Sequence, residues 1–316
     1  NLADELTPLN YYTILSDEEP ASVYTNANLR SFRITQPLQI NMENDSLHMR
    51  FYSPVGIKEV TVMAKSPTMD EYVEFVYIDN IPAFADIKTS IKVLEKGLYR
   101  TESGKIQQLS AEEINPASLS LKISCNDPYW TKISQIKAKW YIKFVLNGGN
   151  PVTGVPNNNW WGIRPVHCRE AVALYLNIGY MCTLEKFQQR VSTFQGTLLD
   201  NNRYPIDTST IIPKLENLSG FDIGLVYSGN GVSGLGGGRT WGVYQKSFLY
   251  HYENSGGCCS TIFHELGHCL GYNHNSTMTY GKWASGCADV FYKNNIKDFP
   301  VNSHTILKSR SNPNIY

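Results

Sequence analysis

Cysteine, tryptophan and glycine are unevenly distributed along this 316-residue chain, and their distribution constrains the fold more than any other sequence feature. All 7 cysteines and all 6 tryptophans lie from Cys125 onward, as do all of the 24 glycines except Gly56, Gly97 and Gly104. The chain is also longer than one small hydrophobic core requires. The change in composition near residues 125–130 therefore predicts two domains.

Apolar residues alternate with polar ones in short runs between residues 31 and 124, for example in residues 47–51 (LHMRF) and 72–77 (YVEFVY). A period of two is the side-chain period of a β-strand. Breaks that contain proline or glycine separate the runs at the spacing typical of an all-β sandwich. We therefore expect an N-terminal all-β, immunoglobulin-like sandwich over residues 31–128, preceded by a leader or linker over residues 1–30.

The second half of the chain mixes strand and helix patterns. Residues 133–146 begin with alternation, residues 168–180 and 183–199 have helical spacing with Thr183 as an N-cap, and residues 221–227 resemble a buried strand. Strands that alternate with helices indicate an α/β domain. The expected fold class is thus multidomain, with an α/β catalytic domain over residues 129–316.

Charge and hydropathy exclude several function classes. Lys plus Arg and Asp plus Glu each number 28, so the chain has no net charge and lacks the basic surface of a nucleic-acid-binding protein. No apolar run approaches the ~18 residues that a membrane-spanning helix needs, so we expect no transmembrane segment. The chain begins with Asn1 rather than Met, so we expect that an upstream piece, such as a signal peptide, has been removed by processing or by the design of the expressed chain, which permits export.

The most informative segment is His264-Glu265-Leu266-Gly267-His268, followed by Gly271 and His274. Histidines at positions i and i+4 share one face of a helix, so both imidazoles can bind one zinc ion at ~2.0 to 2.1 Å. Glu265 then projects beside the metal, where a carboxylate can accept a proton from activated water. The segment predicts a catalytic zinc site rather than a histidine-containing core helix.

Gly271 has a structural role in this prediction. A glycine that follows the last helical turn can adopt positive φ, end the helix and turn the chain back. His274 can then reach the same metal ion as His264 and His268. Three protein ligands leave a fourth position for water or substrate, which is the catalytic pattern rather than the structural one. The expected cofactor is one Zn²⁺ ion.

The pattern H-E-x-x-H-x-x-G-x-x-H resembles the signature of the metzincin zinc endopeptidases, and the eleven-residue match is complete. This resemblance implies cleavage of peptide bonds in polypeptide or glycoprotein substrates. It also implies a methionine turn beneath the metal, for which Met278 is available, and a tyrosine, Tyr280, that stabilises the tetrahedral intermediate. Only three residues separate His274 from Met278, a shorter connection than in most metzincin branches.

The resemblance further implies a substrate-pairing strand before the active-site helix. Residues 235–244 occupy that place, with Leu235, Gly236, Gly237 and Trp241 as the predicted substrate-binding residues. Glycines there would let a peptide main chain approach and form ladder hydrogen bonds. Residues 282 and 283 are expected to shape the pocket for the side chain that follows the cleaved bond. The nearby G-x-G-x-x-G at residues 229–234 is not a dinucleotide site, because no helical sequence follows it.

Three alternatives remain open in the sequence. The chain could be a non-catalytic exported binding or adhesion protein with a structural zinc site. Cys269 could be a further metal ligand, although a small buried thiol fits that position, and Cys125 or Asp127 could bind the zinc of a latent enzyme. A glycan on the sequon Asn275-Ser276-Thr277 would crowd the metal, which favours a bacterial protein at the cell surface, in the periplasm or in the medium.

Overall fold

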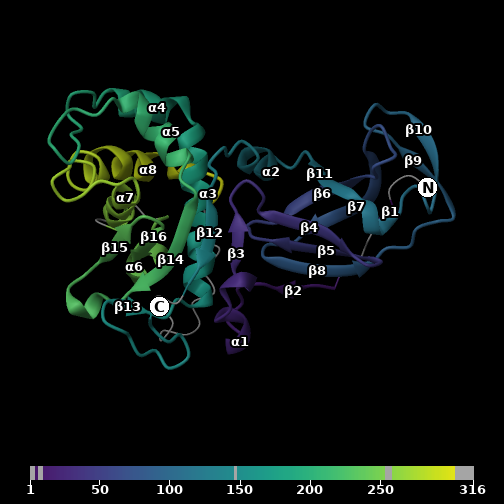
Figure 1. Ribbon diagram of the computed structural model, residues 1–316, viewed down its shortest axis with the longest axis horizontal. Coiled ribbons are helices and arrows are strands. Elements are labelled where there is room, and N and C mark those ends of the chain that lie inside the picture. The colour runs from purple at the N-terminus through teal and green to yellow at the C-terminus, as the bar shows by residue number, and fades with distance from the viewer. Residues whose placement is uncertain (1–3, 6–9, 146–147, 253–257, 303–316) are drawn as a thin grey trace. The chain divides into compact units, whose positions relative to one another are not determined.

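The computed structural model describes residues 4–5, 10–145, 148–252 and 258–302. The chain forms two compact units (Figure 1). Unit 1 comprises Asn1–Ile14 and Gln36–Lys132, and unit 2 comprises Leu15–Thr35 and Ile133–Tyr316. The chain therefore enters unit 2 briefly before it completes unit 1.

Unit 1 contains two four-stranded sheets and a hairpin. The first sheet has the strand order β1-β7-β6-β11, with bounds Asp4–Glu5, Val73–Ile81, Ile57–Lys65 and Ser120–Cys125. The second has the order β2-β8-β5-β4, with bounds Tyr12–Thr13, Ala85–Ser90, Ser46–Phe51 and Leu38–Glu43. The hairpin pairs β9 (Lys96–Arg100) with β10 (Ile106–Ser110), and the short helices η2 (Pro116–Ser118) and α2 (Pro128–Ile133) flank β11.

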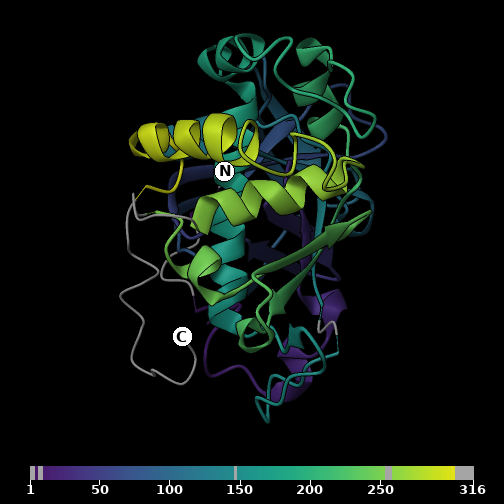
Figure 2. The ribbon, with the colours of Figure 1, turned by 90° about the vertical axis from the view of Figure 1, so that its left-hand side faces the viewer.

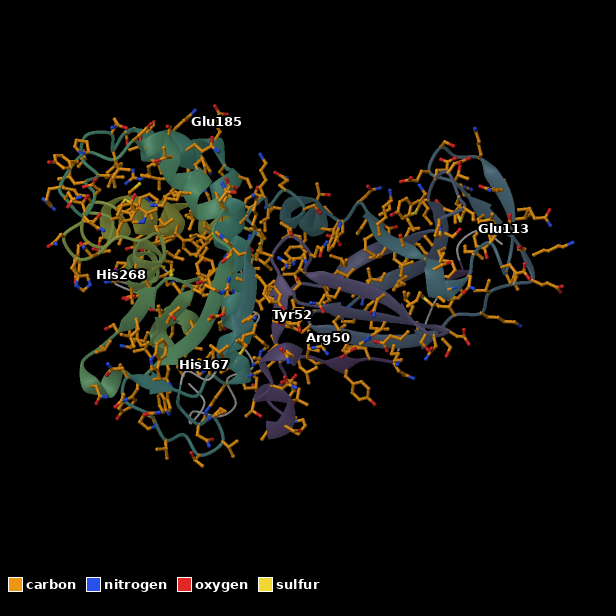
Figure 3. The ribbon with its side chains drawn as sticks, in the orientation of Figure 1. Arg50, Tyr52, Glu113, His167, Glu185 and His268 are labelled. Carbon is orange, nitrogen blue, oxygen red and sulfur yellow. The ribbon has the colours of Figure 1, made fainter. Side chains whose placement is uncertain are left out.

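The alternation predicted from the sequence explains the core of unit 1. On β5, Leu47, Met49 and Phe51 are fully buried, while the intervening residues are partly exposed. One apolar cluster contains buried side chains from both sheets, including Val62 of β6, so the two sheets share a core. On the other face of β5, the Arg50 guanidinium donates a 3.1 Å hydrogen bond to the hydroxyl of the buried Tyr52 (Figure 3). The immunoglobulin-like classification of this arrangement stays a prediction.

Unit 2 is built on one mixed sheet with the order β15-β16-β14-β12-β3. The three central strands are parallel, and the outer strands β15 and β3 are antiparallel to their neighbours. The bounds are Gly234–Gly237, Thr240–Val243, Gly220–Val226, Tyr141–Phe144 and Ser31–Arg33, and the short β13 (Trp160–Trp161) pairs with the end of β14. The buried strand predicted at residues 221–227 is thus confirmed as β14.

Two helices, α3 (Pro165–Thr183) and α7 (Cys258–Cys269), cover one face of this sheet (Figures 1 and 2). Pro165 at the first helical turn suits the start of α3, because its missing N–H would have no partner there. Trp241 of β16 joins both helices: its ring contacts Tyr175 of α3, and its Nε1 donates to the Ile262 carbonyl of α7. Helix α7 is therefore packed against the sheet through Trp241 of β16.

The remaining helices of unit 2 are short. The α-helices are α1 (Ala21–Tyr24), α4 (Glu185–Ser192), α5 (Ile211–Glu216), α6 (Gln245–Leu249) and α8 (Val290–Asn295). The 3-10 helices are η1 (Ala27–Leu29), η3 (Thr208–Thr210), η4 (Ser228–Asn230) and η6 (Ile296–Asp298), and η5 (Ala284–Asp289) is a π-helix. Among the described residues, no helix has the length and apolar character needed to cross a membrane.

The structure differs from the sequence expectations at two boundaries. Ser31–Arg33 was expected in the β-sandwich, but it pairs with β12 of unit 2, where Phe32 is fully buried. Of the segment before it, expected to be a leader or linker, residues 15–30 also belong to unit 2, where Arg169 of α3 donates hydrogen bonds to the Leu15 carbonyl and the Asp17 carboxylate. The helix expected over 183–199 has Leu184 as N-cap and ends at Ser192, before Gly196 with φ +84°.

Candidate metal centre

Helix α7 presents His264 and His268 on one face and ends in a Schellman motif. The amide of Gly271, which has φ +92°, donates to the His268 carbonyl, and the amide of Tyr272 donates to the Gly267 carbonyl. A side chain at position 271 would be strained by this positive φ. The turn reverses the chain so that His274 lies beside the two helical histidines.

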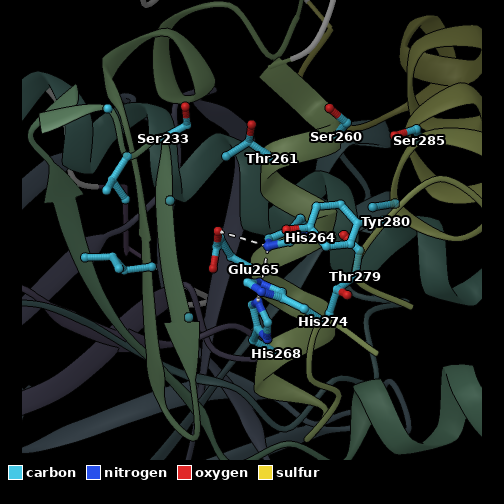
Figure 4. A pocket seen from close by; sticks show the side chains of 16 residues that line it. Ser233, Ser260, Thr261, His264, Glu265, His268, His274, Thr279, Tyr280 and Ser285 are labelled. Atoms are coloured by element: carbon cyan, nitrogen blue, oxygen red, sulfur yellow. Dashed lines mark hydrogen bonds and ion pairs between the residues drawn. The ribbon is translucent and has the colours of Figure 1, made fainter. Parts of the chain in front are cut away.

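The imidazoles of His264, His268 and His274 point toward one another (Figure 4). Nε2 of His268 lies 3.1 Å from Nε2 of His264 and 3.0 Å from Nε2 of His274. Tetrahedral binding at ~2.05 Å would place two nitrogens about 3.3 Å apart, close to these values. This group of three histidines could therefore hold a metal ion.

Main-chain carbonyls fix which ring nitrogens face the centre. Nδ1 of His268 lies 2.7 Å from the Tyr272 carbonyl oxygen, and Nδ1 of His264 contacts the Thr279 carbonyl oxygen. Because a carbonyl oxygen only accepts, both Nδ1 atoms carry the proton, and in the neutral rings both Nε2 atoms present lone pairs. Two such lone pairs 3.1 Å apart repel each other unless a cation lies between them.

Burial supports the neutral form of these ligands. Partial burial lowers the pKa of His264 and of His268, which favours the unprotonated imidazole that binds metals. The two carbonyl partners also orient the rings, as outer hydrogen bonds commonly do in metal sites. The donor set thus fits a borderline-soft divalent cation such as Zn²⁺.

Glu265 lies beside this group, between α7 and β15 (Figure 4). Its Oε1 is 3.8 Å from Nε2 of His264, the side chain is only 4% exposed, and burial raises its pKa to about 8. A nearby cation would return the carboxylate to its charged form. Gly234 and Gly236 provide the space, since a Cβ atom at Gly234 would lie 2.2 Å from Glu265 Oε1 and one at Gly236 would lie 2.7 Å from Oε2.

Met278 and Tyr280 occupy different positions around the histidines. Met278 is fully buried, and its carbonyl lies so close to α7 that a Cβ atom at Gly267 would approach it to 2.6 Å. Tyr280 is 54% exposed, and its ring centroid lies 4.7 Å from that of His264 and 5.2 Å from that of His274. Met278 is therefore buried with its carbonyl against α7, whereas Tyr280 is an exposed side chain beside the rings of His264 and His274.

The histidines open into a cleft of about 730 Å³. One wall contains Gly234, Leu235 and Gly236 of β15, and the opposite wall contains Tyr280, Ala284 and Ser285. Ser260 and Thr261 of α7 add hydroxyl groups to the lining. Within the part of the chain that the structure describes, β15 forms no further sheet pairing beyond β16, so one edge of this strand is an edge of the sheet.

Several expected substrate residues lie elsewhere. The single strand expected over residues 235–244 is a hairpin of β15 and β16, with Gly237 at φ +146° at the end of β15. Trp241 was expected to contact substrate, but it is fully buried on β16 because its ring fills the space beneath α7. Trp283 is likewise buried at 1% exposure, and neither it nor Lys282 lines the cleft, where Ala284 and Ser285 lie instead.

The other candidate ligands have local partners. Cys269 is buried and its thiol lies 3.3 Å from the Thr240 carbonyl, which is the position of a packed core thiol. In unit 1, the Asp127 carboxylate accepts hydrogen bonds from the amides of Lys58 and Tyr129, and the Cys125 thiol contacts the Lys58 carbonyl. Among the described residues, the group that could hold a metal consists of the three histidines.

Sequence reasoning did not identify the carbonyls of Tyr272 and Thr279 or the role of Gly234. Main-chain acceptors carry no residue-type signal, and Gly234 had been considered only as part of the rejected nucleotide motif. In comparisons with known proteins, no family model, no curated protein and no solved structure matches the chain.

Proposed function

We propose that this protein is a zinc-dependent endopeptidase of the metzincin type that cleaves polypeptide or glycoprotein substrates outside the cytoplasm. One observation carries the proposal: three imidazole Nε2 atoms converge beside a buried carboxylate at the base of a cleft. A purely structural zinc site has no need of that carboxylate. The sequence pattern H-E-x-x-H-x-x-G-x-x-H and the buried Met278 that follows it support the same proposal.

In this proposal His264, His268 and His274 hold the metal ion through Nε2. A zinc ion supplies Lewis-acid chemistry when bound, because it acidifies water and polarises a carbonyl group. The carboxylate of Glu265 accepts the proton of the attacking water and then donates it to the leaving amine. The separation of 3.8 Å between Glu265 Oε1 and His264 Nε2, one of the atoms that would hold the metal, supports this role.

The cleft walls align and hold the substrate. An extended peptide can add to the edge of β15 through main-chain hydrogen bonds, because among the described residues this strand pairs on one side only, with β16. The Tyr280 hydroxyl, on the solvent side of the histidines, is suited to donate a hydrogen bond to the oxyanion that develops on the substrate. Ala284 and Ser285 bound the space for a side chain next to the cleaved bond.

The replacement Glu265→Gln tests the proposal. It keeps the shape of the side chain and removes the proton acceptor, so zinc content should stay at one ion per chain while cleavage of an unfolded protein falls by at least 100-fold. Zinc is measured by elemental analysis and cleavage by peptide release. Glu185→Gln is the matched control, because Glu185 lies exposed on α4, where its carboxylate accepts a hydrogen bond from the Gln189 side chain.

The alternative is a non-catalytic exported binding protein that uses zinc for stability. It predicts that the wild-type protein and Glu265→Gln have equal activity in this assay, at the level of the buffer control. That result would contradict the endopeptidase proposal even if both proteins contained zinc. Zinc content without activity would then assign the three histidines a structural role.

A further inference from the structure

A segment distant in sequence is hydrogen-bonded to the loop that carries His274. The Leu199 carbonyl accepts hydrogen bonds from the Thr277 amide and the Ser276 hydroxyl, and the Leu199 amide donates to the Thr277 hydroxyl oxygen at 2.7 Å. These bonds join residues 77 or 78 positions apart along the chain. They fix one end of the loop between the last turn of α7 and Met278.

Asn201 bonds to the other end of the same loop. Its side-chain amide nitrogen donates to the Gly271 carbonyl at 3.1 Å, and its side-chain oxygen accepts from the Asn273 amide at 2.7 Å. One side chain therefore spans the turn that leads into His274. Arg203 completes the arrangement, since its Nη1 donates to the Asn275 carbonyl at 3.0 Å. The residues immediately before and after His274 are thus each held by a side chain from residues 201–203.

His274 depends on its backbone more than the other two histidines do. His264 and His268 lie on a regular helix, and their Nδ1 atoms have carbonyl partners. His274 lies outside the helix and is exposed, and among the described residues no hydrogen bond orients its Nδ1. The hydrogen bonds to its neighbours Asn273 and Asn275 therefore determine the direction in which its Nε2 points.

We propose that Asn201 is a positioning residue that orders the loop around His274 and thereby sets the affinity of the site for its metal ion. Arg203 assists from the other side of His274. The inference rests on the proposed metal site, but it concerns the metal-binding step and not cleavage. Asn201 itself touches neither metal nor substrate.

Replacement of Asn201 by Ala tests this role through metal affinity. Loss of both hydrogen bonds should raise the Zn²⁺ dissociation constant roughly tenfold, measured by competition with a chromophoric chelator. Asn201→Asp retains the acceptor for the Asn273 amide and loses the donor to Gly271, so its affinity should be intermediate. Asn202→Ala is the matched control, because the Asn202 side chain is exposed and the hydrogen bond to Asp200 is donated by its main-chain N–H, which alanine retains.

A double-mutant cycle separates positioning from a general loss of stability. If Asn201 acts through His274, then Asn201→Ala should not change metal affinity further in a His274→Ala background. The visible spectrum of bound Co²⁺ should also change on Asn201→Ala and remain unchanged on Asn202→Ala. Equal Zn²⁺ affinities of wild type and Asn201→Ala, or additive effects in the cycle, would overturn the positioning role of Asn201 and leave the proposed metal site unaffected. A wild-type protein that binds no metal would overturn the proposed site as well.

Discussion

At the scale of single residues, the candidate metal centre is arranged largely by main-chain atoms. The carbonyls of Tyr272 and Thr279 set the protonation of His268 and His264, and no side-chain substitution can remove them. Their positions follow from the Schellman turn at Gly271 and from the turn that contains Met278. The tautomers of the ligands are therefore a consequence of the local backbone path.

Another histidine, His167, lies outside the metal centre and makes the free energy of unfolding depend on pH. It is fully buried near the start of α3, and its Nδ1 accepts a 3.3 Å hydrogen bond from the Arg164 amide. Burial, together with three nearby arginines, lowers its pKa to about 3. Above pH ~6.5 His167 is neutral in both the folded and the unfolded chain, whereas below it the unfolded chain binds a proton that the folded chain excludes.

We therefore expect His167 to reduce the free energy of unfolding by about 1.4 kcal/mol for each pH unit between about 6.5 and 3. His167→Asn keeps an acceptor near the Arg164 amide and removes the titration. Its unfolding free energy, from urea titrations followed by tryptophan fluorescence, should decline less steeply with acid than that of wild type. Parallel slopes between pH 7 and pH 4 would show that His167 does not titrate in this way.

At the scale of elements, strand β15 and helix α7 fit together only because β15 has alternate glycines. Gly234 and Gly236 face Glu265, and a methyl group at either position would overlap its carboxylate. We expect Gly236→Ala to displace Glu265 and to reduce kcat about 10- to 100-fold with little change in bound zinc, because the three atoms nearest to an added Cβ all belong to Glu265. Elemental analysis and kcat from peptide cleavage check this. Unchanged kcat would mean that the carboxylate has room to move without loss of function.

Local patterns in the sequence predicted the elements of the site better than their surroundings. The convergence of three imidazoles followed from spacing within eleven residues, because one helix and one turn determine it. The burial of Trp241 and the bonds of Asn201 depend on contacts between distant segments, for which periodicity carries no signal. The sequence suggests substrate access as the role of the glycines at 236, 237, 238 and 242, yet Gly236, together with Gly234, makes room for Glu265.

At the scale of the whole molecule, the chain contributes to unit 2 in two separate pieces. Alternation identified residues 32–34 as strand-like, but a period of two does not reveal the partner of a strand. Neighbouring elements usually pair, so residues 31–35 were placed with the strands that follow them. The structure instead pairs β3 with β12, about 110 residues later in sequence, as the bond between Ser31 and Tyr141 illustrates.

This arrangement predicts that residues 133–316 alone form an unstable fragment. Without residues 15–35 the fragment lacks the burial of Phe32 and Ile34, worth about 1.5–3 kcal/mol each, and exposes the edge of β12. That loss is a large part of the free energy of unfolding of 5–15 kcal/mol that is typical of a domain.

Urea unfolding tests this expectation. The fragment should unfold at a lower midpoint urea concentration than unit 2 in the intact chain, and addition of a synthetic peptide of residues 15–35 should restore the higher midpoint. A scrambled peptide of the same composition is the control. Equal midpoints without the peptide would mean that residues 15–35, and β3 within them, contribute little to the stability of unit 2.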